Sequence, residues 1–126
     1  MADPVKKILM IDDDEIQLAI AQSVLRSDYQ ISMANSGQEG LQLIYKGLIP
    51  DLILLDIMMP GMDGWETFRR IKAITILHSI PIAFITSISE EDSIKRANEL
   101  GASDYITKPY SSDDLLSRVS KILEKK

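Results

Sequence analysis

An aspartate stands at the point where an apolar segment ends. The segment Leu52 to Leu55 has the unbroken apolar character of a strand buried on both faces, and Asp56 follows it at once. Carboxylates avoid burial unless they are paired or bind a metal, so this acid either faces water in a turn or belongs to a site. The following loop contains Pro60, Gly61 and Gly64, which favour a rigid turn beside the acid.

Four more polar residues adjoin other apolar segments. Asp12 and Asp13 follow one segment, Thr86 ends another, and Lys108 follows a third. If folding brings them beside Asp56, the carboxylates repel one another, which raises the pKa of at least one of them unless a divalent cation is bound. All-oxygen ligands select a hard ion, and so few carboxylates suit Mg²⁺ better than Ca²⁺, with Mn²⁺ able to substitute. A cation, a lysine and a hydroxyl around an aspartate are also what phosphoryl transfer to a carboxylate requires. Because the sequence contains no glycine-rich phosphate loop, ATP is not the expected donor.

Five strand patterns alternate with five helix patterns along the chain. We expect strands at 5–11, 29–34, 52–55, 80–86 and 103–107, and helices that begin near 15, 36, 64, 89 and 111. This alternation predicts a single doubly wound α/β domain over residues 1–126, with a parallel sheet covered by helices on both faces. Right-handed crossovers place the carboxyl ends of all five strands at one edge, where open α/β sheets bind ligands. That edge would carry Asp12, Asp13, Asp56, Thr86 and Lys108.

Helical spacing assigns an inner face to each helix. In the first helix this face comprises Ile16, Ala19, Ile20, Ser23 and Val24, with Leu25 at its edge. In the second it comprises Leu41, Ile44, Tyr45 and Leu48, in the third Trp65, Phe68 and Ile71. In the last it comprises Leu115, Leu116, Val119, Ile122 and Leu123. The fourth helix has few apolar residues and is expected to be lightly anchored. Ser36 with Glu39, and Ser89 with Asp92, have the spacing of helix caps, and Gly101 is expected to end the fourth helix.

Composition narrows the functional class. With 126 residues, 45% of them hydrophobic, the chain is large enough for an ordinary hydrophobic core. A formal net charge of -5 argues against direct nucleic-acid binding, which depends on lysine and arginine. No cysteine is present, and no apolar run approaches the roughly 18 residues of a membrane span. A cytoplasmic protein without a membrane segment is therefore expected.

Four motifs together resemble the receiver domain of two-component response regulators. They are Asp12-Asp13 after the first strand, DIMMPGMDG around Asp56, Thr86 at the end of IPIAFIT, and DYITKPY with Lys108. Each motif alone is weak, but all four in this order and spacing are highly specific, and the resemblance covers about residues 6–123. It implies the flavodoxin-like strand order 2-1-3-4-5 known from chemotaxis receivers, which puts the first and third strands side by side.

The resemblance also implies a role for each acid. Asp56 would be the phosphoacceptor, Asp13 a direct Mg²⁺ ligand, and Asp12 a ligand acting mainly through water. The main-chain carbonyl of Met58 would complete the metal ligands from the protein.

Further roles concern the switch. Lys108 would pair with the phosphoryl group, Thr86 would move to hydrogen-bond it, and Tyr105 would turn inward when Thr86 shifts. The resemblance further implies a cis bond between Lys108 and Pro109. Ser87 departs from the Ala or Gly common in the family, and its side chain would either narrow access to the phosphoryl group or offer it another donor.

The implied function is a phosphorylation-controlled switch that turns over no metabolite and catalyses only its own phosphorylation and dephosphorylation. A sensor histidine kinase or a histidine phosphotransfer protein would supply the phosphoryl group. The face formed by the fourth helix, fifth strand and last helix would then recruit a downstream protein or a second copy. The charged residues of this face that are able to pair across a symmetric dimer are Lys95, Arg96, Asp104 and Arg118. Both a stand-alone regulator and a part of a larger protein fit this function.

Two other functional classes are weighed against the switch. The pattern Asp12-x-Asp14 suggests a haloacid-dehalogenase-like phosphatase, but that family needs a further acidic pair after a later strand and usually a longer chain. A phosphorylation-independent scaffold would keep the fold without the chemistry, and the intact set of acids, threonine and lysine argues against it.

Overall fold

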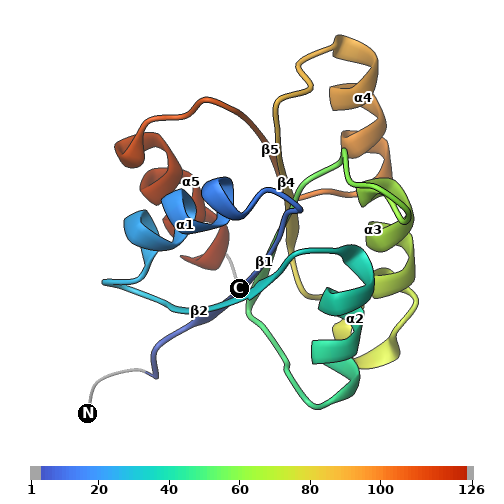
Figure 1. The fold of residues 1–126 in the computed structure, drawn as a ribbon, viewed down its shortest axis with the longest axis horizontal. Coiled ribbons are helices and arrows are strands. Elements are labelled where there is room, and N and C mark those ends of the chain that lie inside the picture. Colours follow the sequence, from blue (N-terminus) through green and yellow to red (C-terminus); the bar gives the residue numbers. More distant parts are fainter. Residues whose placement is uncertain (1–3, 125–126) are drawn as a thin grey trace.

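The fold is built on one five-stranded sheet, seen in a computed structural model that describes residues 4–124. The strand order is β2-β1-β3-β4-β5, and every neighbouring pair is parallel, which confirms the expected order. The strands run through the middle of the molecule, between the helices (Figure 1). The strands are β1 Lys7–Ile11, β2 Gln30–Ala34, β3 Leu52–Leu55, β4 Ile82–Thr86 and β5 Asp104–Thr107. The central strands β3 and β4 are buried along their whole length, as their unbroken apolar sequences predict.

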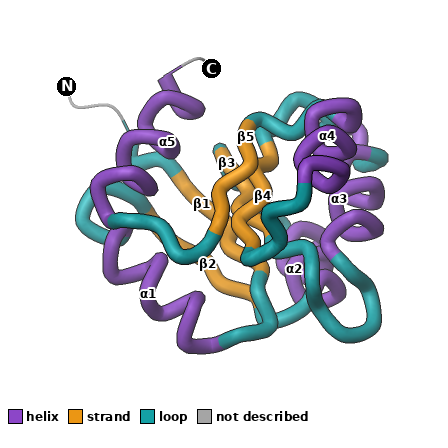
Figure 2. Tube along the Cα trace, turned by 90° about the horizontal axis from the view of Figure 1, so that it is seen from above, coloured by secondary structure: helices purple, strands orange, loops and turns teal. Residues whose placement is uncertain are grey.

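Helices cover both faces of the sheet. They are α1 Glu15–Leu25, α2 Gly37–Tyr45, α3 Gly64–Lys72, α4 Glu91–Leu100 and α5 Ser112–Glu124, with a short 3₁₀ turn η1 at Thr75–Leu77. Figure 2 shows α1 and α5 on one face and α2, α3 and α4 on the other, and each face has its own apolar core. The doubly wound α/β architecture is therefore confirmed. Within the described residues, no helix combines the length and the apolar character that a membrane crossing requires.

The inner face predicted for α1 is mostly wrong, although Val24 packs against the core and the edge residue Leu25 is buried. Leu18, Ala21 and Leu25 are buried, whereas Ile16 and Ile20 are 69% and 44% exposed. Both sets have helical spacing, so periodicity does not choose between them. In the structure α1 begins after the N-cap Asp14, and it turns Leu18, Ala21 and Leu25 toward the sheet.

The inner faces of the other helices are mostly confirmed. In α2, Leu41 and Ile44 are buried, but Tyr45 is 71% exposed because it is the last helical residue and lies at the end of the packed face. Phe68 and Ile71 of α3 are buried. In α5 the fully buried residues are Leu115, Val119 and Leu123.

Helix α4 is held to the core by few contacts, as expected. Ala97 is its only buried residue, and its N-cap is Glu90, without a side-chain cap, rather than the predicted Ser89. Gly101 ends the helix with a φ of 91°, in the left-handed region that favours glycine, which confirms that prediction. The Arg96 guanidinium lies 4.2 Å from the centre of the Trp65 ring and links α4 to α3.

Candidate functional site

The carboxyl ends of four neighbouring strands bring the predicted residues together. The register pairs Ile11 of β1 with Leu55 of β3, so the next residues, Asp12 and Asp56, stand side by side. The Asp56 N–H donates to the carbonyl of Ile11 at 2.9 Å. The Lys108 N–H likewise donates to a β4 carbonyl at 2.8 Å, which holds the start of the following loop against the same edge.

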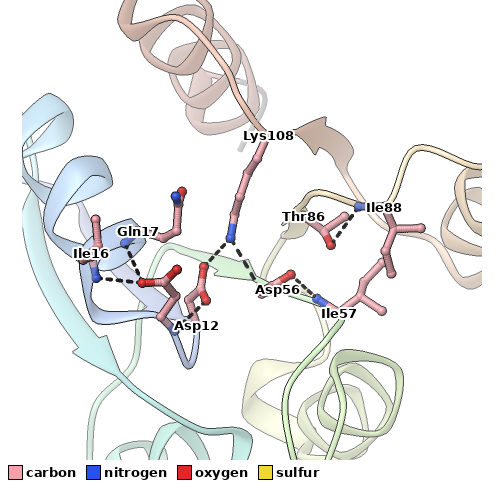
Figure 3. A network of polar contacts seen from close by, with 9 residues as sticks. Asp12, Ile16, Gln17, Asp56, Ile57, Thr86, Ile88 and Lys108 are labelled. Atoms are coloured by element: carbon pink, nitrogen blue, oxygen red, sulfur yellow. Dashed lines mark hydrogen bonds and ion pairs between the residues drawn. The ribbon is translucent and has the colours of Figure 1, made fainter.

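A buried lysine lies between two buried carboxylates. The Lys108 Nζ is 2.6 Å from Oδ2 of Asp12 and 3.5 Å from Oδ2 of Asp56 (Figure 3). The three side chains are only 12%, 7% and 9% exposed. The remaining oxygens accept from the main chain: Asp12 Oδ1 from the N–H of Asp14 at 3.0 Å, and Asp56 Oδ1 from that of Ile57 at 2.8 Å. Two carboxylates therefore share one lysine, and one negative charge stays uncompensated by it.

The pKa of Asp56 is raised above its ordinary value of 3.8. Burial is the largest cause, and the charge of Asp12 raises this pKa further. Lys108 and hydrogen bonds from Thr86 and Ile57 oppose the shift without cancelling it. A raised pKa was expected from repulsion between carboxylates, but desolvation contributes more than repulsion does.

The residues present fit a divalent cation. Asp12, Asp13 and Asp56 each offer an oxygen, and these oxygens all lie within 4.8 Å of one another. All three are hard oxygen ligands, two of them are buried, and the net negative charge around Asp56 favours a cation. The three aspartates line a groove of about 550 Å³. Met58 lines this groove too, and its side chain is exposed.

The predicted switch residues meet at the loop after β4. Thr86 is fully buried, and its Oγ1 accepts a hydrogen bond from the N–H of Ile88 at 3.4 Å. Tyr105 is partly buried and donates its hydroxyl to the carbonyl of Ile88 at 2.7 Å. Ser87 is exposed at the rim of the groove, and the bond between Lys108 and Pro109 is cis, as the resemblance implies.

Two features of the site escaped the sequence analysis. From the sequence, Gly64 is expected to allow a positive φ in the loop and to stand where a helix begins. It is the first residue of α3, but it has no positive φ and instead sits against the main chain of Asp56. Tyr110 and Gln17 line the groove beside Asp12. The one signal for Tyr110 was its place in the DYITKPY motif, two residues after Lys108.

The raised pKa predicts how pH affects the stability of the metal-free protein. The folded state disfavours ionised Asp56, so at neutral pH this group lowers the free energy of unfolding. As the pH falls through the raised pKa, the carboxyl of the folded protein takes up a proton, and the lost stability begins to return. It is fully recovered below pH 3.8, the pKa of this carboxyl in the unfolded chain. The other charged groups near this carboxyl are Lys108, Asp12 and Asp13. They are present both in the wild type and in the Asp56→Asn variant with which it is compared next.

We therefore expect Asp56→Asn to be more stable than the wild type at pH 7 in EDTA, with the difference shrinking as the pH falls. Urea unfolding of both proteins at several pH values measures it. A difference that is constant or grows toward acid pH would show that burial of the charged carboxyl does not destabilise the fold.

Comparison with known proteins places the chain in a family. The model of the response regulator receiver domain matches residues 8–120. The chain is 36% identical over 118 residues to the transcriptional regulatory protein AfsQ1 of Streptomyces coelicolor, covering 94% of this chain and 51% of that protein. It is 39% identical over 121 residues to the phosphate regulon transcriptional regulatory protein PhoB of Pseudomonas aeruginosa, covering 95% and 52%. The chain thus spans about half the length of these two relatives.

Solved structures agree. A CheY-like response regulator receiver domain protein from Methanospirillum hungatei superposes with a TM-score of 0.86 at 28% identity, covering 97% of this chain and 96% of that one. Receiver domains of response regulators are signalling switches that histidine kinases phosphorylate and that act on downstream effectors. They typically bind Mg²⁺ at an acidic pocket such as the one formed by the three aspartates. With its fold, its acidic strand edge and a family match over most of its length, the chain belongs to the receiver domains of two-component response regulators.

Proposed function

We propose that residues 1–126 act as one receiver domain in which Asp56 accepts a phosphoryl group and thereby switches the surface of the protein. One observation carries the proposal: Asp56 is a buried carboxylate with a raised pKa that lies beside a lysine and two further acids at the carboxyl edge of the sheet. A buried, charge-perturbed carboxylate beside an open groove is typical of a reacting group.

Asp12, Asp13, Asp56 and the main-chain carbonyl of Met58 would hold Mg²⁺. When bound, the ion supplies positive charge to the oxygens of the phosphoryl group in transit. Asp56 must be ionised to attack, and an oxygen of its carboxylate then forms a bond to phosphorus while the bond from phosphorus to the donor breaks. The product is an acyl phosphate on Asp56, and the donor leaves with the bonding electron pair.

Lys108 has a second partner within reach when the phosphoryl group arrives. Its Nζ already lies 3.5 Å from Asp56 Oδ2, so a small movement from Asp12 brings the ammonium to a phosphoryl oxygen. Thr86, whose hydroxyl acts to lower the pKa of Asp56, would move to donate to another phosphoryl oxygen. Both groups place positive charge or a donor where the new negative charge appears.

The switch would reach the surface through Ile88. Thr86 accepts from its N–H and Tyr105 donates to its carbonyl, so a shift of Thr86 toward Asp56 disturbs both hydrogen bonds. The neighbouring helix α4 has one buried residue and no side-chain cap, which makes it the element most easily displaced. The face of α4, β5 and α5 is therefore our candidate surface for a downstream protein or a second copy. On that face Arg118 already pairs with Asp104 at 2.9 Å and with Asp114 at 3.1 Å within the chain.

Incubation with acetyl phosphate and Mg²⁺ tests the proposal by intact-protein mass spectrometry. We expect the wild type to gain the mass of one HPO₃, and expect this gain to vanish in EDTA and in Asp56→Asn. Asp63→Asn is the matched control, because Asp63 is an acid of the same loop that caps α3 and because asparagine caps equally well. Rapid release of phosphate without dependence on Asp56 would point to a phosphatase, and an inert wild type to a scaffold.

A further inference from the structure

The Tyr110 hydroxyl has an unusual environment. Among residues 4–124, its Oη is the only fully buried side-chain polar atom that makes no hydrogen bond to the protein. The ring is partly buried against the apolar core under α1 and α5, so the packing fixes the direction in which the hydroxyl points. A buried donor without an acceptor is unfavourable, and native proteins rarely keep one without a reason.

Tyr110 lines a very small cavity. The cavity has a volume of about 10 Å³, close to the space that one water molecule needs. Its polar residues are Tyr110, Asp12, Gln17 and Lys108, and its remaining lining is apolar: Met10, Ile11, Leu18, Ala21, Leu54 and Ile85. The same four polar residues also line the groove above the aspartates. The cavity therefore lies directly behind the site.

Each polar residue around the cavity has hydrogen-bonding capacity to spare. The Asp12 oxygens accept one bond each, from Asp14 and from Lys108, and a carboxylate oxygen has room for a second. Burial and the negative charge of Asp12 raise the pKa of Tyr110, so its hydroxyl keeps its proton and remains a donor. The side-chain amide of Gln17 makes no hydrogen bond to any of residues 4–124, and Gln17 lines the cavity together with Asp12 and Lys108.

We propose that one water molecule occupies this cavity and joins the Tyr110 hydroxyl to the Asp12 carboxylate and the Gln17 amide. Tyr110 is then a positioning residue for Asp12. A water with three polar partners is the usual form of a structural water. This role rests on the proposed function. When Lys108 moves from Asp12 to the phosphoryl group, the bridge keeps Asp12 oriented toward the metal.

The stability of Tyr110→Phe without metal shows whether the Tyr110 hydroxyl has no hydrogen-bond partner or is bound to a water. If the hydroxyl has no partner, its removal relieves an unfavourable burial and the Tm in EDTA rises. If the water bridge exists, removal of the hydroxyl breaks a hydrogen bond and leaves the water with fewer partners. We then expect the Tm to fall by about 3 °C. Tyr45→Phe, at an exposed tyrosine far from the cavity, is the control and should leave the Tm unchanged. This readout does not depend on phosphorylation.

Magnesium titration by calorimetry tests the positioning role. We expect Tyr110→Phe to weaken Mg²⁺ binding about fivefold, the equivalent of one typical hydrogen bond lost. Gln17→Leu removes a second partner of the same water, so it should weaken binding similarly, and the double variant should lose little more than either single one. Fully additive losses, or wild-type affinity in Tyr110→Phe, would overturn the role.

A high-resolution crystal structure of the wild type tests the water directly. We expect density for one water within hydrogen-bonding distance of Tyr110 Oη and an Asp12 oxygen. A dry cavity, together with a higher Tm of Tyr110→Phe, would overturn the inference. Failure of the wild type to take up phosphoryl from acetyl phosphate would instead refute the proposed function, while the density and the Tm would still decide on the water.

Discussion

Replacing Lys108 by methionine is expected to lower the free energy of unfolding of the metal-free protein by about 3 kcal/mol. Methionine keeps much of the length and apolar volume of the side chain but removes the only cation within 4 Å of Asp12 and Asp56 among the described residues. Both carboxylates then remain buried without a counter-charge, which is far more costly than losing a surface ion pair. Urea unfolding in EDTA measures the loss.

Magnesium should partly reverse this effect. In the variant the cation would supply the positive charge that the lysine supplied, so added Mg²⁺ should stabilise Lys108→Met more than it stabilises the wild type. Lys95→Met is the matched control, because Lys95 is an exposed lysine of α4, and we expect it to change stability by less than about 0.5 kcal/mol. If Lys108→Met proved as stable as Lys95→Met in EDTA, the lysine would not be compensating buried charge.

Gly64→Ala is expected to destabilise the fold by about 3 kcal/mol or more. A Cβ at this position would lie 2.6 Å from the Cα of Ile57 and 2.9 Å from the carbonyl carbon of Asp56, and closer still to the Asp56 carbonyl oxygen. These are main-chain atoms that carry the phosphoacceptor, and they are held further by the 2.7 Å hydrogen bond from the Gly64 N–H to the Ile57 carbonyl. Relief of the clash therefore requires a shift of Asp56 itself, so we expect phosphoryl uptake to fall as well.

Gly37→Ala provides the comparison for this prediction. Gly37 is the first residue of α2, as Gly64 is of α3, and it too is buried. Its Cβ would meet side-chain atoms of Thr67 and Met62 rather than main chain, so relief costs at most the hydrogen bond from the Thr67 hydroxyl to the Asp63 carbonyl and leaves the Asp56 main chain in place. Thermal unfolding and the acetyl phosphate assay on both variants test the contrast. Equal losses of stability and equal phosphoryl uptake would show that close approach of α3 to the Asp56 main chain is unimportant.

The arrangement of the sheet was predictable because it follows from a simple alternation. Strand patterns that alternate with helix patterns allow few topologies, and in all of them the carboxyl ends of the strands share one edge. Asp12, Asp56, Thr86 and Lys108 each stand at such an end, so their convergence needed no detail of side-chain packing. The strand order itself came from resemblance to a known family.

The parts that sequence could not supply depend on rotation and close approach. Two sets of apolar residues in α1 both have helical spacing, so the sequence does not show that Leu18 rather than Ile16 is buried. The sequence does not distinguish a glycine needed because main chain approaches closely from one needed for a positive φ. Gly64 is of the first kind, although its place in the loop suggested the second. Tyr110 resembles any packing aromatic until the surroundings of its hydroxyl are known.

Chemical mapping of the phosphorylated residue tests the central claim most directly. Borohydride reduces an aspartyl phosphate to homoserine, which peptide mass spectrometry then locates in the chain. After incubation with acetyl phosphate and Mg²⁺, we expect homoserine at position 56 alone, and none when EDTA is present. Homoserine at another acid, or equal labelling of position 56 without a divalent ion, would contradict a magnesium-dependent phosphoacceptor at Asp56.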